Sequence, residues 1–474
     1  PAMMPLVHEL QLTPWQAFQA AADLPCVLFF DSALPDPDLG RYSYVLADPW
    51  KVLRCRLADH PSEADVAAAS RRTFDALAES LEPLRMEALP DLPPFQGGAA
   101  GLFGYGLCHA VERLPRFRHD EFEVPDFVVG LYDWVYAYDH AAECGWVIST
   151  GFPAADTARR RRAELRLRQA LAWLQRPPTS PNFQRLRATA DIVPQFSTSL
   201  GEGITSNFSR EAFLRAIARG IEYVHAGDCF QVNLAQRLLA PLRDSPLELY
   251  NRLRQRNPAP FAAYFDLGDF VVASASPERF LRLMPDGLIE TRPIKGTRPR
   301  GLTPEQDRLL AAELAASAKD RAENVMIVDL LRNDLGRVCT YGTIQVPQLC
   351  QVESYRTVHH LVSVVTGKLR GEAHAVSLLK AAFPGGSVTG APKVRAMEII
   401  AELEPTARGP YCGCLGWIGF DGAMDTNILI RTFTLSRNWI QFPVGGGIVA
   451  DSKPEAEYEE TLHKAAGLVR ALLP

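Results

Sequence analysis

The sequence lacks the cysteine pattern of a disulfide-stabilised or zinc-binding protein. Its nine cysteines are an odd number without paired spacing, which is typical of a reducing compartment. The closest approach to a metal-binding pattern is Cys412 and Cys414, which lie in an apolar run without a second pair. We expect both to be buried thiols.

Long hydrophobic runs and an excess of positive charge are also missing. No apolar run is long enough to cross a membrane, and the region around His8 and Glu9 has no apolar core of signal-peptide length. The net charge of −5 gives no electrostatic reason to expect nucleic acid or an anionic membrane as a partner. We expect a cytoplasmic protein that binds small molecules or other proteins.

Two glycine-rich stretches do not match nucleotide-binding loops. Residues 97–106 lack the glycine spacing of the dinucleotide fingerprint, and close strand packing explains them better. Residues 385–390 have the spacing of a Walker loop, but Ala391 and Pro392 stand where Lys and Ser or Thr should follow. These 474 residues also contain no Gly-x-Cys-x-Gly elbow with a later His-x-Glu, so no glutaminase is predicted within them.

The composition is that of a large globular α/β protein. Hydrophobic residues make up 47% and charged residues 22%, enough for a large core. We expect three regions: a β-rich region at 1–180, a linker or long loop at 181–204 that is rich in Pro, Ser, Thr and Gly, and a catalytic region at 205–474. The expected strands are 26–30, 42–46, 128–132, 230–234, 261–265 and 270–275, and the expected helices are 64–84, 156–175, 209–226 and 247–256.

An extended stretch at 289–300 carries the most informative lysine. Its prolines bar a helix, and strand alternation would place Thr291, Lys295 and Thr297 on one face. Gly296 would let a ligand approach the backbone closely. Lys295 is either a candidate nucleophile or a solvated lysine on an edge strand.

Two predicted helices carry carboxylates. Asp320 and Glu323 share a face of a helix that is apolar nearly all round, so we expect it to be buried with its carboxylates paired to arginines or to a divalent cation. In the C-terminal helix, Ser452 and Glu455 fit a capping box, and Glu457, Glu460 and Lys464 share a face apart from the apolar stripe. The alternative is an ordinary surface pair between Glu460 and Lys464.

Residues 293–297, Pro-Ile-Lys-Gly-Thr, resemble a motif of the chorismate-utilising enzymes, in the branch that makes 4-amino-4-deoxychorismate. The anthranilate-forming branch carries Ala where this chain has Lys295. Further blocks follow in order, from residues 276–280 to Glu457 and Glu460, and the resemblance is dense after Asn207. It implies an α/β (α+β) fold in which large antiparallel sheets pack as a sandwich with helices outside.

The resemblance also implies roles for individual residues. Lys295 would be the nucleophile and Glu278 the general acid–base, while Glu323 and Glu460 would hold Mg²⁺ with Asp320 and Glu457 beside them. Gln231 stands where isochorismate- and salicylate-forming relatives have a lysine that activates water, which favours ammonia as the second nucleophile. The residues implied to bind substrate are Thr297, His360, Ser387, Tyr411, Arg431, Gly445, Gly446, Gly447 and Lys464.

The same resemblance implies partners and leaves rivals open. Chorismate and ammonia would be the substrates, and a separate glutamine amidotransferase subunit would release the ammonia. Ser32, Tyr42 and Ser43 lie where relatives bind tryptophan, although strand packing explains them equally well. The rivals are an anthranilate synthase component I, a non-catalytic relative, and a Schiff-base aldolase using Lys295.

Overall fold

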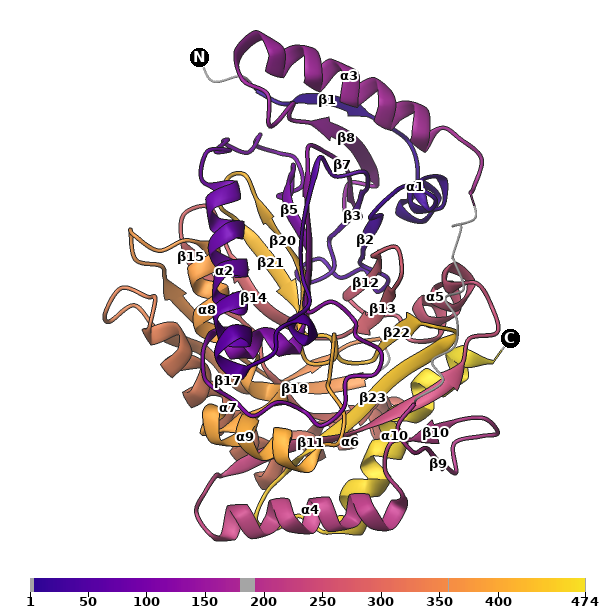
Figure 1. Ribbon diagram of the computed structural model, residues 1–474, viewed down its shortest axis with the longest axis vertical. Helices are drawn as coiled ribbons and strands as arrows, with labels where there is room; N and C mark the ends of the chain where they lie inside the picture. The colour runs from indigo at the N-terminus through magenta and orange to yellow at the C-terminus, as the bar shows by residue number, and fades with distance from the viewer. Residues whose placement is uncertain (1–3, 180–191, 357, 474) are drawn as a thin grey trace.

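Two large antiparallel β-sheets form the centre of the molecule (Figure 1). The fold is taken from a computed structural model, which describes residues 4–179, 192–356 and 358–473. Helices lie outside the sheets, with α3 (Asp156–Leu174) at one end of the molecule and α4 (Arg210–His225) at the other (Figure 1).

The first sheet has 13 strands within the described residues, and all its pairings are antiparallel. Its order is β1 (Leu6–Glu9), β8 (Cys144–Ser149), β7 (Trp134–Asp139), β3 (Tyr42–Leu46), β2 (Leu28–Asp31), β12 (Phe261–Asp266), β13 (Val271–Ser276), β22 (Thr432–Ser436), β23 (Trp439–Ile448), β11 (Gln231–Pro241), β10 (Thr205–Ser206) and β9 (Phe196–Ser197), with β19 (Gly390–Ala391) also on β11.

The second sheet has 10 strands in the same part of the chain and is also antiparallel. Its order is β16 (Ile294–Pro299), β18 (Val358–Lys368), β15 (Leu288–Thr291), β14 (Arg279–Leu283), β21 (Met424–Asn427), β20 (Cys414–Gly419), β5 (Gly98–Phe103), β6 (Phe127–Tyr132) and β4 (Lys51–Cys55), with β17 (Gln345–Ser354) also on β18.

The hydrophobic core lies in layers between and outside the sheets. Leu46 and Val272 of the first sheet share one buried cluster with Leu102 and Leu415 of the second, so the two sheets pack face to face. Their outer faces pack against helices. These are α1 (Pro14–Ala21), α3, α5 (Pro246–Arg256) and α10 (Pro454–Leu472) on the first sheet, and α2 (Glu63–Leu81), α7 (Ala318–Gly336) and α8 (Ala375–Ala382) on the second.

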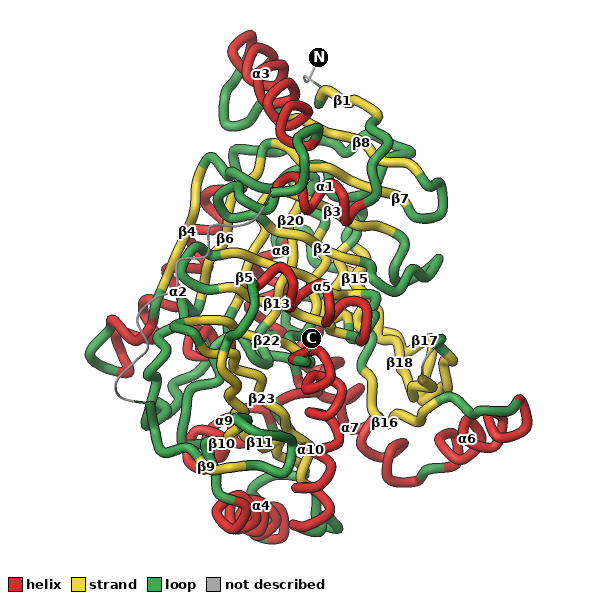
Figure 2. Tube along the Cα trace, turned by 90° about the vertical axis from the view of Figure 1, so that its right-hand side faces the viewer, coloured by secondary structure: helices red, strands yellow, loops and turns green. Residues whose placement is uncertain are grey.

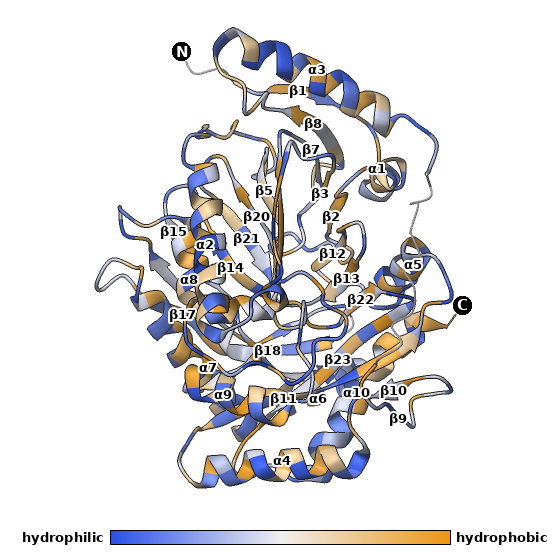
Figure 3. Ribbon diagram, in the orientation of Figure 1, coloured by the Kyte–Doolittle hydropathy of each residue, from blue (hydrophilic) through white to orange (hydrophobic). Residues whose placement is uncertain are grey.

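This arrangement confirms the predicted sandwich with helices outside. α6 (Pro304–Ala316) lies against β16, β17 and β18 on one side of the molecule (Figure 2). Helix α9 (Lys393–Leu403) packs with α4, β11 and β23 at the lower end. Hydrophobic residues dominate the central strands, whereas α3 is hydrophilic along much of its length (Figure 3). Three short 3₁₀ helices complete the fold: η1 (Leu57–Asp59), η2 (Tyr105–Ala110) and η3 (Gly386–Val388).

Both sheets combine strands from either side of the predicted linker. In the first sheet β2 pairs with β12, and in the second β5 pairs with β20. The division into regions 1–180, 181–204 and 205–474 stays a prediction, and residues 180–191 of it lie outside the described residues. In the remainder of the linker, β9 forms the edge of the first sheet by pairing with β10, which directly follows the linker.

Most predicted elements are confirmed, and two local details are wrong. Ser452 does not cap α10: Lys453 is the N-cap residue without a side-chain bond, and the Ser452 hydroxyl instead donates to Glu457 (2.6 Å). Helix α7 is buried on one side only, because Val325 is 39% exposed.

Cys412 and Cys414 are buried thiols, as predicted. Among the described residues, no helix is both long and apolar enough to cross a membrane.

The glycine-rich stretch at 97–106 serves close strand packing. Gly101 in β5 has φ +155°, and a Cβ at this position would lie 2.1 Å from the carbonyl oxygen of Val128 in β6. Gly98 would meet the Ile418 carbonyl of β20 at the same distance. A side chain at either position would push neighbouring strands apart.

We predict that Gly101→Ala destabilises the protein by about 3 kcal/mol or more, because the added methyl group meets backbone that cannot move without breaking the sheet. Denaturant unfolding would measure the loss. Gly371→Ala is the matched control, since a Cβ there meets no heavy atom within 4 Å. Equal stability of the two variants would contradict the packing argument.

Candidate active site

A cavity of about 480 Å³ lies where the two sheets approach each other at one end of the sandwich. Its walls come from β11 and β23 of the first sheet and from β16 and β18 of the second. Helices α7 and α10 contribute charged side chains to its rim. The volume suits a small molecule.

The strand β16 brings Lys295 and Thr297 into the cavity. The register of β16 against β18 shifts between Ile294 and Thr297, and Gly296 has φ +87° at this irregularity. Thr291 precedes it in β15, lies outside the cavity lining and donates to the carbonyl of Phe280 (2.6 Å). The prediction that Thr291 shares this face is therefore wrong.

Gly296 is needed for packing. A Cβ at this position would lie 2.8 Å from the Cγ of Asp320 and 2.8 Å from a methyl of Leu314. The side chain of Asp320, at the start of α7, therefore fills the space above the glycine. Gly296 also lines the cavity, so the predicted close approach of a ligand stays a prediction.

Lys295 is held in a desolvated position. Its Nζ donates to the carbonyl oxygen of Ser387 at 3.1 Å. Burial lowers the pKa of Lys295 below its ordinary value, although the charge of Glu323 partly opposes this. A lowered pKa raises the fraction of neutral amine, the form that can act as a nucleophile. The alternative of a solvated edge-strand lysine is therefore wrong.

Glu278 lies in the turn between β13 and β14 and is only 5% exposed. Burial raises its pKa to about 7, while Ser387 and the charge of Lys295 partly offset the shift. The turn is held by Ser276, whose hydroxyl accepts from the Glu278 N–H (3.3 Å) and donates to the carbonyl of Ile428 (2.5 Å). A carboxyl with this pKa can donate a proton near neutral pH.

The predicted metal carboxylates meet between α7 and α10. Glu323, Glu460 and Asp320 line the cavity, whereas Glu457 lies behind them and is 5% exposed. A Cβ on Gly446 would stand 3.6 Å from an oxygen of both Glu457 and Glu460, so the glycine leaves open space beside them.

Lysines neutralise part of this charge. The Nζ of Lys319 lies 4.0 Å from Oε1 of Glu323 and 3.7 Å from Oε1 of Glu457. The Nζ of Lys464 lies 2.7 Å from Oε1 of Glu460. Within the described residues, no three His, Cys, Asp or Glu side chains form a ready-made metal cluster. The donor set nevertheless suits Mg²⁺, which takes few protein carboxylates and keeps several waters.

The remaining predicted substrate residues also line the cavity. His360 contacts Thr297 through Nδ1 and Oγ1 at 2.9 Å, and burial lowers the pKa of His360 to about 4, so its ring is neutral near pH 7. Lys464 donates to the carbonyl of Gly445 (2.9 Å). Together they form a wall with cationic, hydroxyl and backbone groups; its other predicted members are Ser387, Tyr411, Arg431, Gly446 and Gly447.

The sequence reasoning missed four polar residues of the lining: Lys319, Asn233, Arg298 and Arg408. A signal existed for Lys319, because it stands one helical turn before Glu323. No signal existed for Asn233 or Arg408, whose placement depends on how β11 packs against distant segments.

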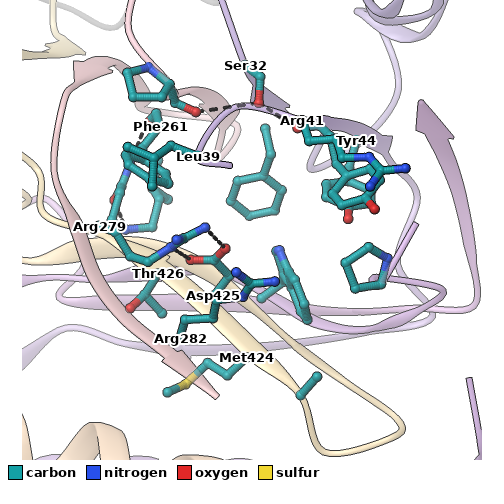
Figure 4. Close-up of a pocket in the computed structure, with 18 of the residues that line it drawn as sticks. Ser32, Leu39, Arg41, Tyr44, Phe261, Arg279, Arg282, Met424, Asp425 and Thr426 are labelled. Atoms are coloured by element: carbon teal, nitrogen blue, oxygen red, sulfur yellow. Dashed lines mark hydrogen bonds and ion pairs between the residues drawn. The ribbon is translucent and has the colours of Figure 1, made fainter. Parts of the chain in front are cut away.

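A second pocket of about 330 Å³ contains part of the predicted tryptophan site (Figure 4). Ser32 and Tyr42 line it, and the Ser32 hydroxyl donates to the Tyr42 carbonyl (2.6 Å). Ser43 lies outside the lining and accepts from the Ser32 N–H (3.0 Å). Other walls are formed by the ring of Tyr44 and by the ion pair between Arg279 and Asp425 (3.0 Å), both labelled in Figure 4.

We predict that Glu278→Gln changes the pH dependence of stability. Because the folded-state pKa of Glu278 is raised to about 7, this group stabilises the fold below its unfolded pKa and loses that contribution as pH rises to 7. Between pH 4 and pH 8, the free energy of unfolding of Glu278→Gln should rise by about 3 kcal/mol relative to that of the wild type. Denaturant unfolding at both pH values would measure it, and a difference independent of pH would contradict the raised pKa.

Comparisons with known proteins agree with this site. Residues 42–470 match the family described as chorismate binding enzyme. The chain is 42% identical over 463 residues to aminodeoxychorismate synthase component 1 of Escherichia coli (strain K12), covering 96% of this chain and 95% of the relative. It is 42% identical over 427 residues to anthranilate synthase component 1 of Thermus thermophilus, covering 86% and 88%.

A solved structure supports the same relationship. The crystal structure of anthranilate synthase component I from Streptococcus pneumoniae TIGR4 has a TM-score of 0.75 and 31% identity, covering 92% of this chain and 94% of that chain. The menaquinone-specific isochorismate synthase MenF of Escherichia coli shares the fold, with a TM-score of 0.71 at 18% identity. The cavity, the order of the motifs and these similarities lead to one conclusion: the chain belongs to the chorismate binding enzyme family.

Proposed function

We propose that the chain converts chorismate and ammonia to 4-amino-4-deoxychorismate through a covalent adduct on Lys295. The observation that carries the proposal is the environment of this lysine, which is desolvated in the cavity and bound to the Ser387 carbonyl. A non-catalytic relative would have no need to bury it beside a proton donor such as Glu278. The anthranilate-forming branch carries Ala at this position.

In the proposed reaction, the neutral amine of Lys295 forms a bond to C2 of chorismate as both ring double bonds shift and the bond from C4 to its hydroxyl breaks. The hydroxyl departs as water with a proton from Glu278. Ammonia then forms a bond to C4, both double bonds shift back, and the bond between C2 and Lys295 breaks. The lysine leaves with a proton that the incoming ammonia has given up.

The other polar residues would orient the substrate. Arg431, Lys464 and the backbone of β23 supply positive charge and donors for the two carboxylates of chorismate. Glu323 and Glu460 would hold Mg²⁺, with Asp320 and Glu457 beside them. When bound, the ion would add positive charge for the ring carboxylate.

We further propose a glutamine amidotransferase subunit as the source of ammonia, since the name of the similar relatives, component 1, implies a second component.

The second pocket is proposed to hold tryptophan, with Ser32 and Tyr42 at its wall and Ser43 behind them. The ring of Tyr44 offers this ligand an apolar surface.

Product analysis tests the function. With chorismate, Mg²⁺ and concentrated ammonium at mildly alkaline pH, mass spectrometry should detect 4-amino-4-deoxychorismate, whereas detection of anthranilate would overturn the proposal.

The kcat of Lys295→Ala should be lower than that of the wild type by at least about 10³-fold, because no other group can replace the lysine amine in the covalent step. Glutamine in place of ammonium should give no product without the partner subunit.

Chelation tests the metal role. EDTA should abolish turnover, and added Mg²⁺ should restore it. Glu460→Gln should raise the Mg²⁺ concentration for half-maximal activity by about tenfold or more, because one ionic ligand is lost. Glu459→Gln, one residue earlier on an exposed face of α10, is the matched control and should leave it unchanged. Full turnover in EDTA would remove the carboxylates from this role.

A further inference from the structure

A buried ion pair reaches the cavity wall, where Arg408 is part of the lining and Glu404 lies behind it. Arg408 is 5% exposed and Glu404 is 4% exposed. The guanidinium donates to Glu404 through two nitrogens, Nε to Oε2 at 3.0 Å and Nη2 to Oε1 at 2.6 Å. Such a bidentate arrangement fixes the orientation of the planar guanidinium.

The same guanidinium binds two carbonyl groups from separate segments. Nη1 donates to the carbonyl of Val388 at 3.0 Å, and Nη2 donates to the carbonyl of Asn233 at 3.0 Å. Glu404 Oε1 in turn accepts from the N–H of Ala235 at 2.9 Å. The pair therefore joins the end of α9, the first half of β11 and the turn at η3.

These contacts reach the reacting groups through one residue. Val388 follows Ser387, whose carbonyl accepts the hydrogen bond from Lys295 Nζ. Asn233 and Ala235 lie opposite Gly447 and Gly445 in the register of β11 and β23, so they also back the glycine wall of the cavity. The guanidinium also lies 4.9 Å from the ring of Tyr105 and 5.6 Å from that of Tyr411, which close it off from water.

We propose that Arg408, oriented by Glu404, is a positioning residue that fixes the Ser387 carbonyl and thereby the amine of Lys295. This inference rests on the proposed function of Lys295. Arginine is suited to the task because one rigid plane donates to Glu404, Val388 and Asn233 at once. A lysine would keep the charge but could not make these four bonds from one fixed plane.

A buried ion pair elsewhere in the chain gives a matched control. Arg166 in α3 is 7% exposed and donates to Asp133 (3.0 Å) and to the carboxylate (2.8 Å) and carbonyl (2.7 Å) of Asp48. It lies on the helix at the far end of the molecule from α4 (Figure 1). Arg166→Lys therefore removes a comparable guanidinium without touching the cavity.

The first test compares kinetics and stability in Arg408→Lys and Arg166→Lys. Both should lower the melting temperature, but only Arg408→Lys should lower kcat, by about 100-fold, since small displacements of reacting groups are this costly. The KM for chorismate should change less than about threefold, because the carboxylate-binding residues stay in place. Glu404→Gln, which keeps one oxygen for Ala235, should lower kcat by a smaller factor and covers the case in which Arg408→Lys does not fold.

The second test needs no turnover. Acetylation of Lys295 by acetic anhydride, followed by peptide mass spectrometry across pH, reports the pKa of its amine, with exposed Lys453 as internal reference. In Arg408→Lys the midpoint for Lys295 should fall below its wild-type value, because the ammonium form loses its acceptor when the Ser387 carbonyl is displaced, and in Arg166→Lys it should not move.

The two tests separate the two ideas. If the wild type makes no 4-amino-4-deoxychorismate but the Lys295 midpoint moves only in Arg408→Lys, the proposed function fails and the positioning role stands. Retention of kcat within about twofold together with an unmoved midpoint in Arg408→Lys would overturn the positioning role. So would equal loss of kcat in both variants, because the ion pair would then act only through stability.

Discussion

The site depends on the removal of water from two ionisable groups. Burial pushes Lys295 toward its neutral amine and Glu278 toward its protonated acid, so a single physical cause moves both pKa values toward neutrality. These uncharged forms are the ones that the proposed nucleophile and the proposed proton donor need.

Such burial requires walls without voids and without unpaired charge. The two sheets supply both apolar and polar parts of the walls. In β23, Gly446 leaves space beside Glu460, whereas Gly445 and Gly447 let β11 pack closely. The charges that remain are compensated locally, by Lys319 and Lys464 at the carboxylates and by Glu404 at Arg408. Such pairing offsets part of the free-energy cost of removing charged groups from water.

The parts of the fold and the site that depend on local sequence were predictable. The helices with Glu323 and Glu460 and the strand with Lys295 follow from periodicity and turn residues, whereas the sandwich was implied by the resemblance to the family. Other features depend on contacts between distant segments. Arg408 four residues after Glu404 is indistinguishable in sequence from a solvated pair, and it is buried only because β11 and η3 close over it. Thr291 turns away because of an irregularity in β16 that alternation cannot reveal.

The interleaving of early and late strands has a consequence for how the chain reaches its fold. β5 lies between β6, its near neighbour in sequence, and β20, which begins at Cys414, far later in the chain. The edge of β5 that later receives β20 therefore waits unpaired while the intervening residues emerge. Pairings between such distant segments close slowly, because the chain loses entropy before the contacts form. Folding of this enzyme is accordingly expected to need protection of an exposed strand edge during translation, and its two halves to be interdependent.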